Sequence, residues 1–285
     1  MWGGATNKRW EPWKKIGGSN SVGTTQLKDG AITIDKLSSS LQEGLSAIDT
    51  SNDNMPITFI DSILFIGDSV TNGHNILYKD GEKIFSKSDY NLSYPTMLAK
   101  KCSWLTVNNK AVSGYNIQQA ESIILPKCDC TENLCVIELG WNLRGGEGQY
   151  NTFHDTYDTD VAPYSDYNDY ADTNMGIYCK MIEEIKEKNP NIIICLVCSQ
   201  GWGADNINRT AAVHRIATEY NLPIIDFNDE NLYPVNYRQN SDGTHSTIWG
   251  YALKAEYFIK GLGIALRDHN LNVAELIYKQ KGLLT

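Results

Sequence analysis

Short apolar segments alternate with segments of helical periodicity from residue 57 onward, and this alternation restricts the fold more than any other feature of the sequence. The apolar segments are too short for buried helices, which is typical of buried parallel strands. Strands and helices in alternation predict a parallel sheet with helices on both faces. The expected strands are residues 62–67, 105–109, 134–140, 192–198 and 223–226, and the expected helices are residues 94–101, 116–124, 175–188, 206–220 and 247–266.

The charge of the chain excludes several classes of partner. Its 285 residues carry a formal net charge of -9, whereas a nucleic-acid-binding protein needs clustered Lys and Arg to contact phosphates. The same charge disfavours binding to an anionic membrane surface. The sequence lacks an apolar run long enough to span a bilayer, and its first residues lack the apolar stretch of a secretory signal peptide. We therefore expect a protein made in the cytoplasm, unless a leader has been removed, that binds neither nucleic acid nor membrane.

The first 55 residues differ in composition from the rest, which predicts a small N-terminal extension, residues 1–55, and a main domain, residues 56–285. The extension is rich in Gly, Ser, Thr, Asn and Lys, and residues 17–24 are typical of a flexible stretch. Residues 36–48 can form a short amphipathic helix. Such a segment buries little area alone, so it packs on the main domain, associates with its own copies or acts as a linker.

Residues 29–37, Asp-Gly-Ala-Ile-Thr-Ile-Asp-Lys-Leu, resemble short pieces of bacteriophage tail fibres and other receptor-binding virion proteins. The resemblance covers only about twenty residues around this stretch, and a polar leader of no particular role is the alternative. If it holds, it implies that the chain is attached to a virion and that it self-associates, as a trimer by analogy.

Seven cysteines at irregular spacing make a poor disulfide framework. Cys195 and Cys198 form a C-x-x-C pair inside an apolar run, where buried strand thiols are favoured over a redox pair. Cys128, Cys130 and Cys135 lack zinc-finger spacing, and no histidine is close to them in sequence. We therefore predict no metal site.

Polar or glycine-rich segments follow four of the expected strands, at residues 67–73, 109–115, 140–143 and 241–245. The carboxyl ends of parallel strands lie at one edge of the sheet, and ligands bind there in folds of this type. We therefore expect the four segments to converge on one rim. This convergence is a stronger argument than any one segment alone.

Ser69, His245 and Asp242 are the candidate catalytic residues of that rim. Serine is a poor nucleophile until a base takes its proton, and histidine is the usual base because its pKa lies near neutrality. The histidine needs a carboxylate to fix its tautomer, and Asp242 lies three residues before His245. Each motif alone is more often a turn or a surface loop, but their joint positions at strand ends favour catalysis.

Acyl transfer also needs hydrogen-bond donors for the oxyanion of the tetrahedral intermediate. The sequence offers the backbone N–H groups of Ser69 and Gly114 and the side-chain amide of Asn142. Glycine at position 114 would let the backbone approach the substrate closely. The alternatives are a helix-entry turn at Gly114 and a turn-capping amide at Asn142.

These segments resemble the sequence blocks of the SGNH, or GDSL-type, hydrolases. Residues 67–69, Gly-Asp-Ser, resemble block I, and residues 109–114 are similar to block II with its glycine. Residues 140–142 resemble block III, which ends in asparagine, and residues 242–245 resemble the Asp-x-x-His of block V. The blocks follow the family's order across residues 60–265.

Two positions depart from the family pattern: Leu143 stands where many members have aspartate, and Val70 replaces the leucine of block I. The first change affects local hydrogen bonding rather than the oxyanion donor, and the second is conservative. The resemblance implies a flavodoxin-like three-layer α/β/α sandwich with a parallel five-stranded sheet. It further implies ester hydrolysis through an acyl-serine intermediate without metal or cofactor, and a structural role for Asp68 in ordering the block I turn.

Trp141, Gln200 and Trp202 follow strands and are candidates for substrate contact at the rim. His74 either lines the pocket or is a solvated loop residue, and Trp249 is expected in the core. A long insertion after the third strand, residues 144–172, is rich in Gly, Tyr, Asp and Asn. It is either a carbohydrate-binding face of the site or a disordered loop.

Three functions remain open. The favoured hypothesis is a carbohydrate esterase whose partner is an acylated glycan or another small ester, with bacterial surface polysaccharide as the glycan if the N-terminal resemblance holds. A lipase, lysophospholipase or thioesterase would need a long apolar channel, and no Leu- or Phe-rich lid is visible in the sequence. A non-catalytic glycan-binding tail protein would have no need of Ser69, Asp242 and His245.

Overall fold

The computed structural model describes residues 59–142, 173–201, 204–237, 241–269 and 273–283. The N-terminal extension with its tail-fibre-like segment, the 144–172 insertion and Trp202 lie outside these ranges. Within the described ranges, none of the helices is long and apolar enough to cross a membrane.

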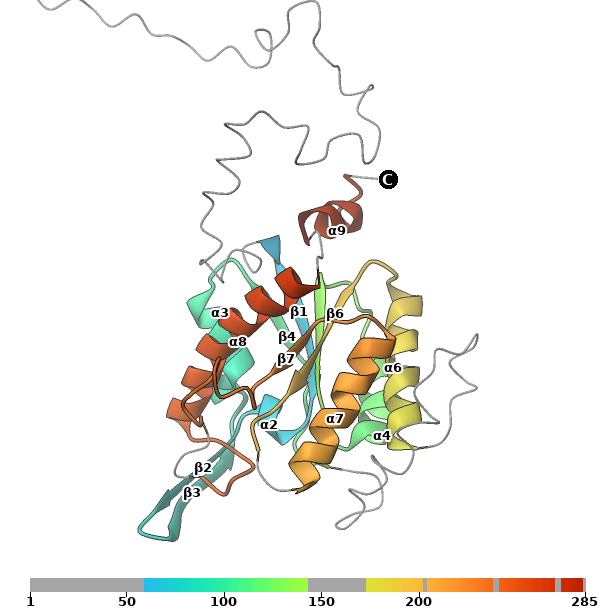
Figure 1. Ribbon diagram of the computed structural model, residues 1–285. Coiled ribbons are helices and arrows are strands. Elements are labelled where there is room, and N and C mark those ends of the chain that lie inside the picture. Colours follow the sequence, from blue (N-terminus) through green and yellow to red (C-terminus); the bar gives the residue numbers. More distant parts are fainter. Residues whose placement is uncertain (1–58, 143–172, 202–203, 238–240, 270–272, 284–285) are drawn as a thin grey trace, which may run out of the picture. The chain divides into compact units, whose positions relative to one another are not determined.

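The centre of the fold is a five-stranded sheet in the order β4-β1-β5-β6-β7, in which every neighbouring pair is parallel (Figure 1). This confirms the predicted α/β class and the five-stranded parallel sheet. The strands agree with the expected segments to within two residues at either end. They are β1 (Ser62–Gly67), β4 (Thr106–Asn109), β5 (Leu134–Glu138), β6 (Ile193–Cys198) and β7 (Ile224–Asp226).

Helices cover both faces of the sheet. Helices α3 and α8 lie on one face, and α4, α6 and α7 lie on the other (Figure 1). Their bounds are α3 (Tyr94–Lys101), α4 (Ile117–Gln119), α6 (Asn174–Lys188), α7 (Ala204–Glu219) and α8 (Ile248–Asp268). The segment after α4 continues as the π-helical turn η5 (Ala120–Ile124) and the 3-10 turn η6 (Leu125–Lys127), and a last helix is α9 (Val273–Gln280).

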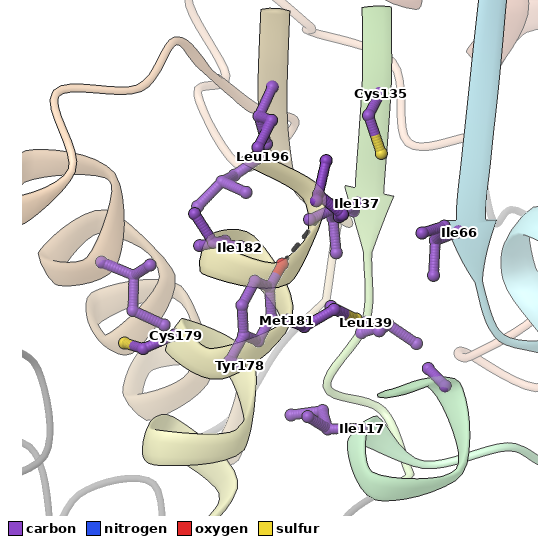
Figure 2. Packing of buried hydrophobic residues seen from close by; sticks show 14 of the residues in the cluster. Ile66, Ile117, Cys135, Ile137, Leu139, Tyr178, Cys179, Met181, Ile182 and Leu196 are labelled. Carbon is purple, nitrogen blue, oxygen red and sulfur yellow. Dashed lines mark hydrogen bonds between the residues drawn. The ribbon is translucent and has the colours of Figure 1, made fainter. Parts of the chain in front are cut away.

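Successive residues of each central strand point to opposite faces, so a wholly apolar strand supplies two cores. On β1, Leu64 and Ile66 pack with α4, α6 and α7, whereas Ile63 and Phe65 pack with α3 and α8. Figure 2 shows the first of these cores, where the Tyr178 hydroxyl donates to the Ile137 carbonyl oxygen at 3.5 Å. All seven cysteines are free and buried, and Cys195 and Cys198 are strand thiols of β6, as predicted. Burial raises the pKa of both thiols.

Residues 74–88 form an antiparallel hairpin that the sequence analysis did not predict. Its strands are β2 (His74–Lys79) and β3 (Glu82–Ser88), joined at Asp80-Gly81, and the short turn η4 (Tyr90–Leu92) follows. The hairpin projects from the body of the domain (Figure 1), and every residue of β3 is exposed. A short parallel bridge between Asn75 and Ser246 connects β2 to the segment that carries His245.

Candidate active site

Ser69 is presented by a tight turn between β1 and the short helix α2 (Ser69–Asn72). Gly67 ends the strand, and a Cβ atom at this position would lie 2.4 Å from Thr71 Oγ1, so no larger residue fits without displacing Thr71. Asp68 is the N-cap of α2, and its Oδ1 accepts a hydrogen bond from Val70 N at 3.0 Å. This is the turn-ordering contact that the resemblance implies for Asp68.

The structure brings Ser69, His245 and Asp242 together in hydrogen-bonding order. His245 Nε2 lies 2.9 Å from Ser69 Oγ, and His245 Nδ1 lies 2.8 Å from Asp242 Oδ2. An ionised carboxylate can only accept, so Nδ1 carries the proton and Nε2 is left to accept the serine proton. The tautomer is therefore the one that a general base requires.

Asp242 is held in its ionised form. Its Oδ1 accepts hydrogen bonds from the backbone N–H groups of Thr244 at 3.0 Å and of His245 at 2.8 Å. Burial works to raise the pKa of Asp242, but these bonds and the His245 ring outweigh it and keep that pKa well below its usual value. The Asp-x-x-His motif is thus a self-contained turn that orients its own histidine.

Hydrogen bonds also join the turn of Ser69 to the segment after β4. Asn72 Nδ2 donates to the Ala111 carbonyl oxygen at 2.8 Å, and Asn109 Nδ2 donates to the Thr71 carbonyl oxygen at 3.0 Å. The segment that contains Gly114 is therefore fixed to α2. The convergence expected from the strand ends is observed for these two segments and for residues 241–245.

The two remaining oxyanion candidates lie on neighbouring segments. Gly114 has a φ of +83°, in the region that favours glycine, and a Cβ atom there would meet nothing within 4 Å. The positive φ, and not a lack of space for a side chain, thus explains why position 114 is a glycine. Asn142 Nδ2 donates to the Tyr115 carbonyl oxygen at 3.1 Å, which ties it to the residue after Gly114. An amide nitrogen carries two hydrogens, so the second can serve an oxyanion.

A buried charge network that the sequence analysis missed lies beneath the turn of Ser69. Glu138, the last residue of β5, accepts a hydrogen bond from Thr71 Oγ1 at 2.8 Å and others from Ser199 Oγ and Lys254 Nζ. Lys254 is fully buried on α8. Burial works to raise the pKa of Glu138, but Lys254 and the hydrogen bonds outweigh it and lower that pKa. Charged residues inside the otherwise apolar patterns of β5 and α8 were the signal available in the sequence.

Asp68 is the second buried carboxyl group of the site. Burial, with a smaller contribution from Glu138, raises its pKa from 3.8 to about 6. Its Oδ2 atom is buried and, among the described residues, has no hydrogen-bond partner. Asp68 therefore shapes the turn through its bond to Val70 N, while burial destabilises the charged form that it takes near neutral pH.

The candidates for substrate contact have different surroundings. Trp141 is half-buried, with the guanidinium carbon of Arg209 3.6 Å from its ring centroid. Gln200 is buried, and its side chain accepts from Tyr237 N at 3.0 Å, which accounts for much of its hydrogen-bonding capacity. A substrate role for either stays a prediction. The expectation that Trp249 lies in the core is wrong: its side chain is 85% exposed, because it lies in the first turn of α8 on the face turned away from the sheet.

Three potential metal ligands that the sequence analysis did not consider together lie close in space. The ligand atoms of Cys198, His214 and Asp226 lie within 4.8 Å of one another, where the ends of β6 and β7 meet α7. His214 Nε2 and Asp226 Oδ2 form a direct contact of 2.8 Å, so a hydrogen-bonded histidine–aspartate pair already explains the arrangement.

The fold and this site together define a class. A hydroxyl, an imidazole and a carboxylate in hydrogen-bonding order, at the carboxyl edge of a parallel sheet, are the arrangement of a serine hydrolase on an α/β scaffold. The model of the GDSL-like Lipase/Acylhydrolase family matches residues 65–253, which is more than half of the chain. The chain belongs to this family, and its class is that of the ester hydrolases.

Solved structures with similar folds include proteins described as GDSL-type lipases and as a carbohydrate esterase. A family two carbohydrate esterase from Clostridium thermocellum, in complex with cellohexaose, is 18% identical, with a TM-score of 0.46 over 78% of this chain and 65% of that chain. A protein described as lipolytic and of the G-D-S-L family from Desulfitobacterium hafniense is 17% identical, with a TM-score of 0.44 over 70% and 99%. One described as a GDSL-like lipase from Parabacteroides merdae is 21% identical, with a TM-score of 0.46 over 71% and 95%. Comparison with curated proteins gives no significant match.

Proposed function

We propose that the chain is a serine esterase that removes small acyl groups, O-acetyl above all, from a carbohydrate such as a bacterial surface polysaccharide. The observation that carries this proposal is the uninterrupted hydrogen-bonded order from Ser69 Oγ through His245 to Asp242. Neither binding nor packing requires a serine hydroxyl to face the unprotonated nitrogen of an imidazole that a carboxylate orients.

The reaction follows from that geometry. Ser69 Oγ attacks the ester carbonyl carbon while His245 Nε2 takes its proton, and the carbonyl oxygen becomes an oxyanion that accepts from the backbone N–H groups of Ser69 and Gly114 and from Asn142 Nδ2. Collapse of the intermediate breaks the bond to the alcohol, which leaves with the proton from His245. Water, deprotonated by His245, then attacks the acyl-serine, and a second collapse releases the carboxylic acid and restores Ser69.

The carbohydrate part of the proposal rests on the 144–172 insertion. In the sequence it follows β5, a strand whose carboxyl end lies at the edge of the sheet where Ser69 lies, and it is rich in tyrosine, aspartate, asparagine and glycine. Aromatic faces and polar side chains in one loop suit a sugar, whose rings pack on aromatic residues while its hydroxyls need hydrogen-bond partners. Acylated glycan is therefore the partner we propose.

One observation favours esters with longer acyl chains as a second candidate. A mainly apolar cavity of about 220 Å³ lies between the hairpin and the start of α8, close in sequence to His74 and His245. An apolar cavity favours an alkyl chain over a sugar, because buried hydroxyl groups without partners are costly. Its lining consists of Asn75, Ile76, Leu77, Phe85, Thr247, Ile248 and Trp249.

Hydrolysis of p-nitrophenyl acetate and of an acetylated glycan by the wild type and by Ser69→Ala tests the mechanism. We expect the substitution to lower kcat/KM by about a thousandfold or more, because removal of a triad nucleophile has effects of that size or larger. Activity that survives the substitution would contradict the mechanism. Rates on acetyl and octanoyl esters separate the two candidates, and glycan binding without any turnover would support the non-catalytic tail protein instead.

A further inference from the structure

We propose that His74 is a positioning residue that links the imidazole of His245 to the loop of Gly114, and that it does so as a neutral ring protonated on Nδ1. The kinetic consequence rests on the proposed function, whereas the protonation state of His74 does not.

His74 packs directly against His245. The two ring centroids are 4.4 Å apart, with an angle of 56° between the ring planes. The backbone around both residues is joined, because Ile76 N donates to the Ser246 carbonyl oxygen at 3.0 Å and the Tyr251 hydroxyl donates to the His74 carbonyl oxygen at 3.0 Å. His74 therefore limits how far the His245 ring can turn on one side.

A chain of hydrogen bonds connects His74 to the segment after β4, and its direction can be deduced from one end. Asn72 Nδ2 donates to the Ala111 carbonyl oxygen, so the amide is oriented with Oδ1 toward Ser113. Ser113 Oγ donates to that Oδ1 at 3.1 Å, which uses its only proton. At the 3.1 Å contact between the two serine hydroxyls, Ser88 Oγ must then be the donor. The remaining contact of Ser88 Oγ, 2.7 Å from His74 Nδ1, requires His74 to donate.

The other nitrogen of His74 fits the same assignment. Nε2 lies 3.3 Å from Ser86 Oγ, which can donate to it. The titratable groups that influence the pKa of His74 are His245, Asp242 and Lys83. Burial lowers the pKa of His74 most, and His245 lowers it further, whereas Asp242 raises it. At neutral pH the ring is therefore uncharged.

A neutral ring in this place suits the reaction. His245 becomes an imidazolium ion when it takes the serine proton, and a second positive ring at 4.4 Å would oppose that step. Ser113 immediately precedes Gly114, so the hydrogen-bond chain also fixes the proposed oxyanion loop relative to the base. A displacement of about 1 Å at such a site can cost about a hundredfold in rate.

The kinetic test compares two serine substitutions on the same strand. Ser88→Ala breaks the chain to Ser113 and is expected to lower kcat for p-nitrophenyl acetate about tenfold with little change in KM, because in this proposal Ser88 acts through His74 and not on the substrate. Ser86→Ala removes only the longer contact to Nε2 and is the matched control, expected within about twofold of the wild type. Two further substitutions separate the functions of the ring: His74→Phe keeps the packing on His245 without the hydrogen bond, and His74→Asn keeps a donor without the ring. A kcat in Ser88→Ala equal to that of Ser86→Ala would overturn the positioning role.

A measurement without substrate separates this inference from the proposed function. Long-range ¹H–¹⁵N spectra of the histidine rings, assigned with His74→Asn, report the tautomer of His74 whether or not the protein hydrolyses esters. We expect a protonated Nδ1 and an unprotonated Nε2 at pH 7, with the pattern altered in Ser88→Ala and kept in Ser86→Ala. A His74 ring protonated on Nε2, or on both nitrogens, at pH 7 would overturn the inference even if Ser69 proves to be the nucleophile.

Discussion

At the scale of single residues, Asp68 orders the turn of Ser69 but places a carboxyl group where burial disfavours its charged form. Asp68 shapes that turn through its hydrogen bond to Val70 N, yet it is fully buried, and within the described part of the chain only one of its carboxylate oxygens accepts a hydrogen bond. Asp242 is the opposite case, a carboxylate whose hydrogen bonds outweigh its desolvation. The pKa of Asp68 is raised and that of Asp242 is lowered, although both residues belong to one site. These opposite shifts distinguish Asp68, which orders the turn, from Asp242, which orients the base His245.

Asp68→Asn should change how stability depends on pH. An unfolded Asp68 loses its proton near pH 3.8, whereas the folded protein keeps that proton until about pH 6. Between these values the folded state binds more protons, so the contribution of Asp68 to stability falls as the pH rises. Relative to the variant, the wild type should lose on the order of 3 kcal/mol of unfolding free energy from pH 3.5 to 7, since one pKa unit corresponds to about 1.4 kcal/mol. Urea unfolding of both proteins across this range measures the difference, and a constant difference would contradict the account.

At the scale of elements, the sheet and its covering helices could be predicted from the sequence, whereas the hairpin could not. Strands such as β1 and β6 are buried on both faces and give unbroken apolar runs, and α3 was predicted with the bounds it has in the structure. The hairpin strand β3 is exposed along its whole length, so no burial pattern marks it, and only Asp80-Gly81 indicated a turn.

The candidate site shows the same contrast. Ser69, Asp242 and His245 could be placed together because each follows a strand. The partners of His74 and the Glu138–Lys254 pair could not, because they join residues far apart in sequence through side-chain contacts that no spacing encodes. Trp249 was misplaced because an aromatic residue in an apolar helix fits the core pattern even when it lies on the solvent face.

Lys254→Met tests whether the buried pair holds α8 to the sheet. The substitution leaves Glu138 buried without its cation, and we expect a loss of about 3–5 kcal/mol of unfolding free energy. Adding Glu138→Gln should recover part of that loss, because Gln carries no charge and keeps one acceptor oxygen, while the hydroxyl that faces its amide nitrogen can accept instead of donate. Lys101→Met is the control: it removes an exposed ion pair with Glu256 and should cost less than about 1 kcal/mol. Urea unfolding of the wild type and of these three variants measures the losses, and equal losses in Lys254→Met and Lys101→Met would contradict a role for the buried pair in holding α8.

At the scale of the whole molecule, the described domain carries every residue that we assign to the reaction. For the N-terminal extension we propose self-association, because residues 29–37 resemble segments of tail fibres. A short apolar segment that buries little area alone can gain stability by packing on copies of itself.

Light scattering on the full chain and on a chain that begins at Pro56 tests this proposal. We expect a higher mass, consistent with a trimer, for the full chain and a monomer for the shortened one. Comparable rates on p-nitrophenyl acetate would show that the shortened chain is folded. Identical monomeric masses would dispose of a role for the extension in assembly.

The most direct test of the central claim is the site at which an alkyl p-nitrophenyl phosphonate reacts, because phosphonates are attacked by an activated serine and remain bound to it. Mass spectrometry of the digested protein should find one adduct, on Ser69. Labelling should be absent in Ser69→Ala and should slow by at least about a hundredfold in His245→Ala. An adduct on any other residue, or labelling of Ser69 at an unchanged rate without His245, would contradict the conclusion that the imidazole of His245 activates the hydroxyl of Ser69.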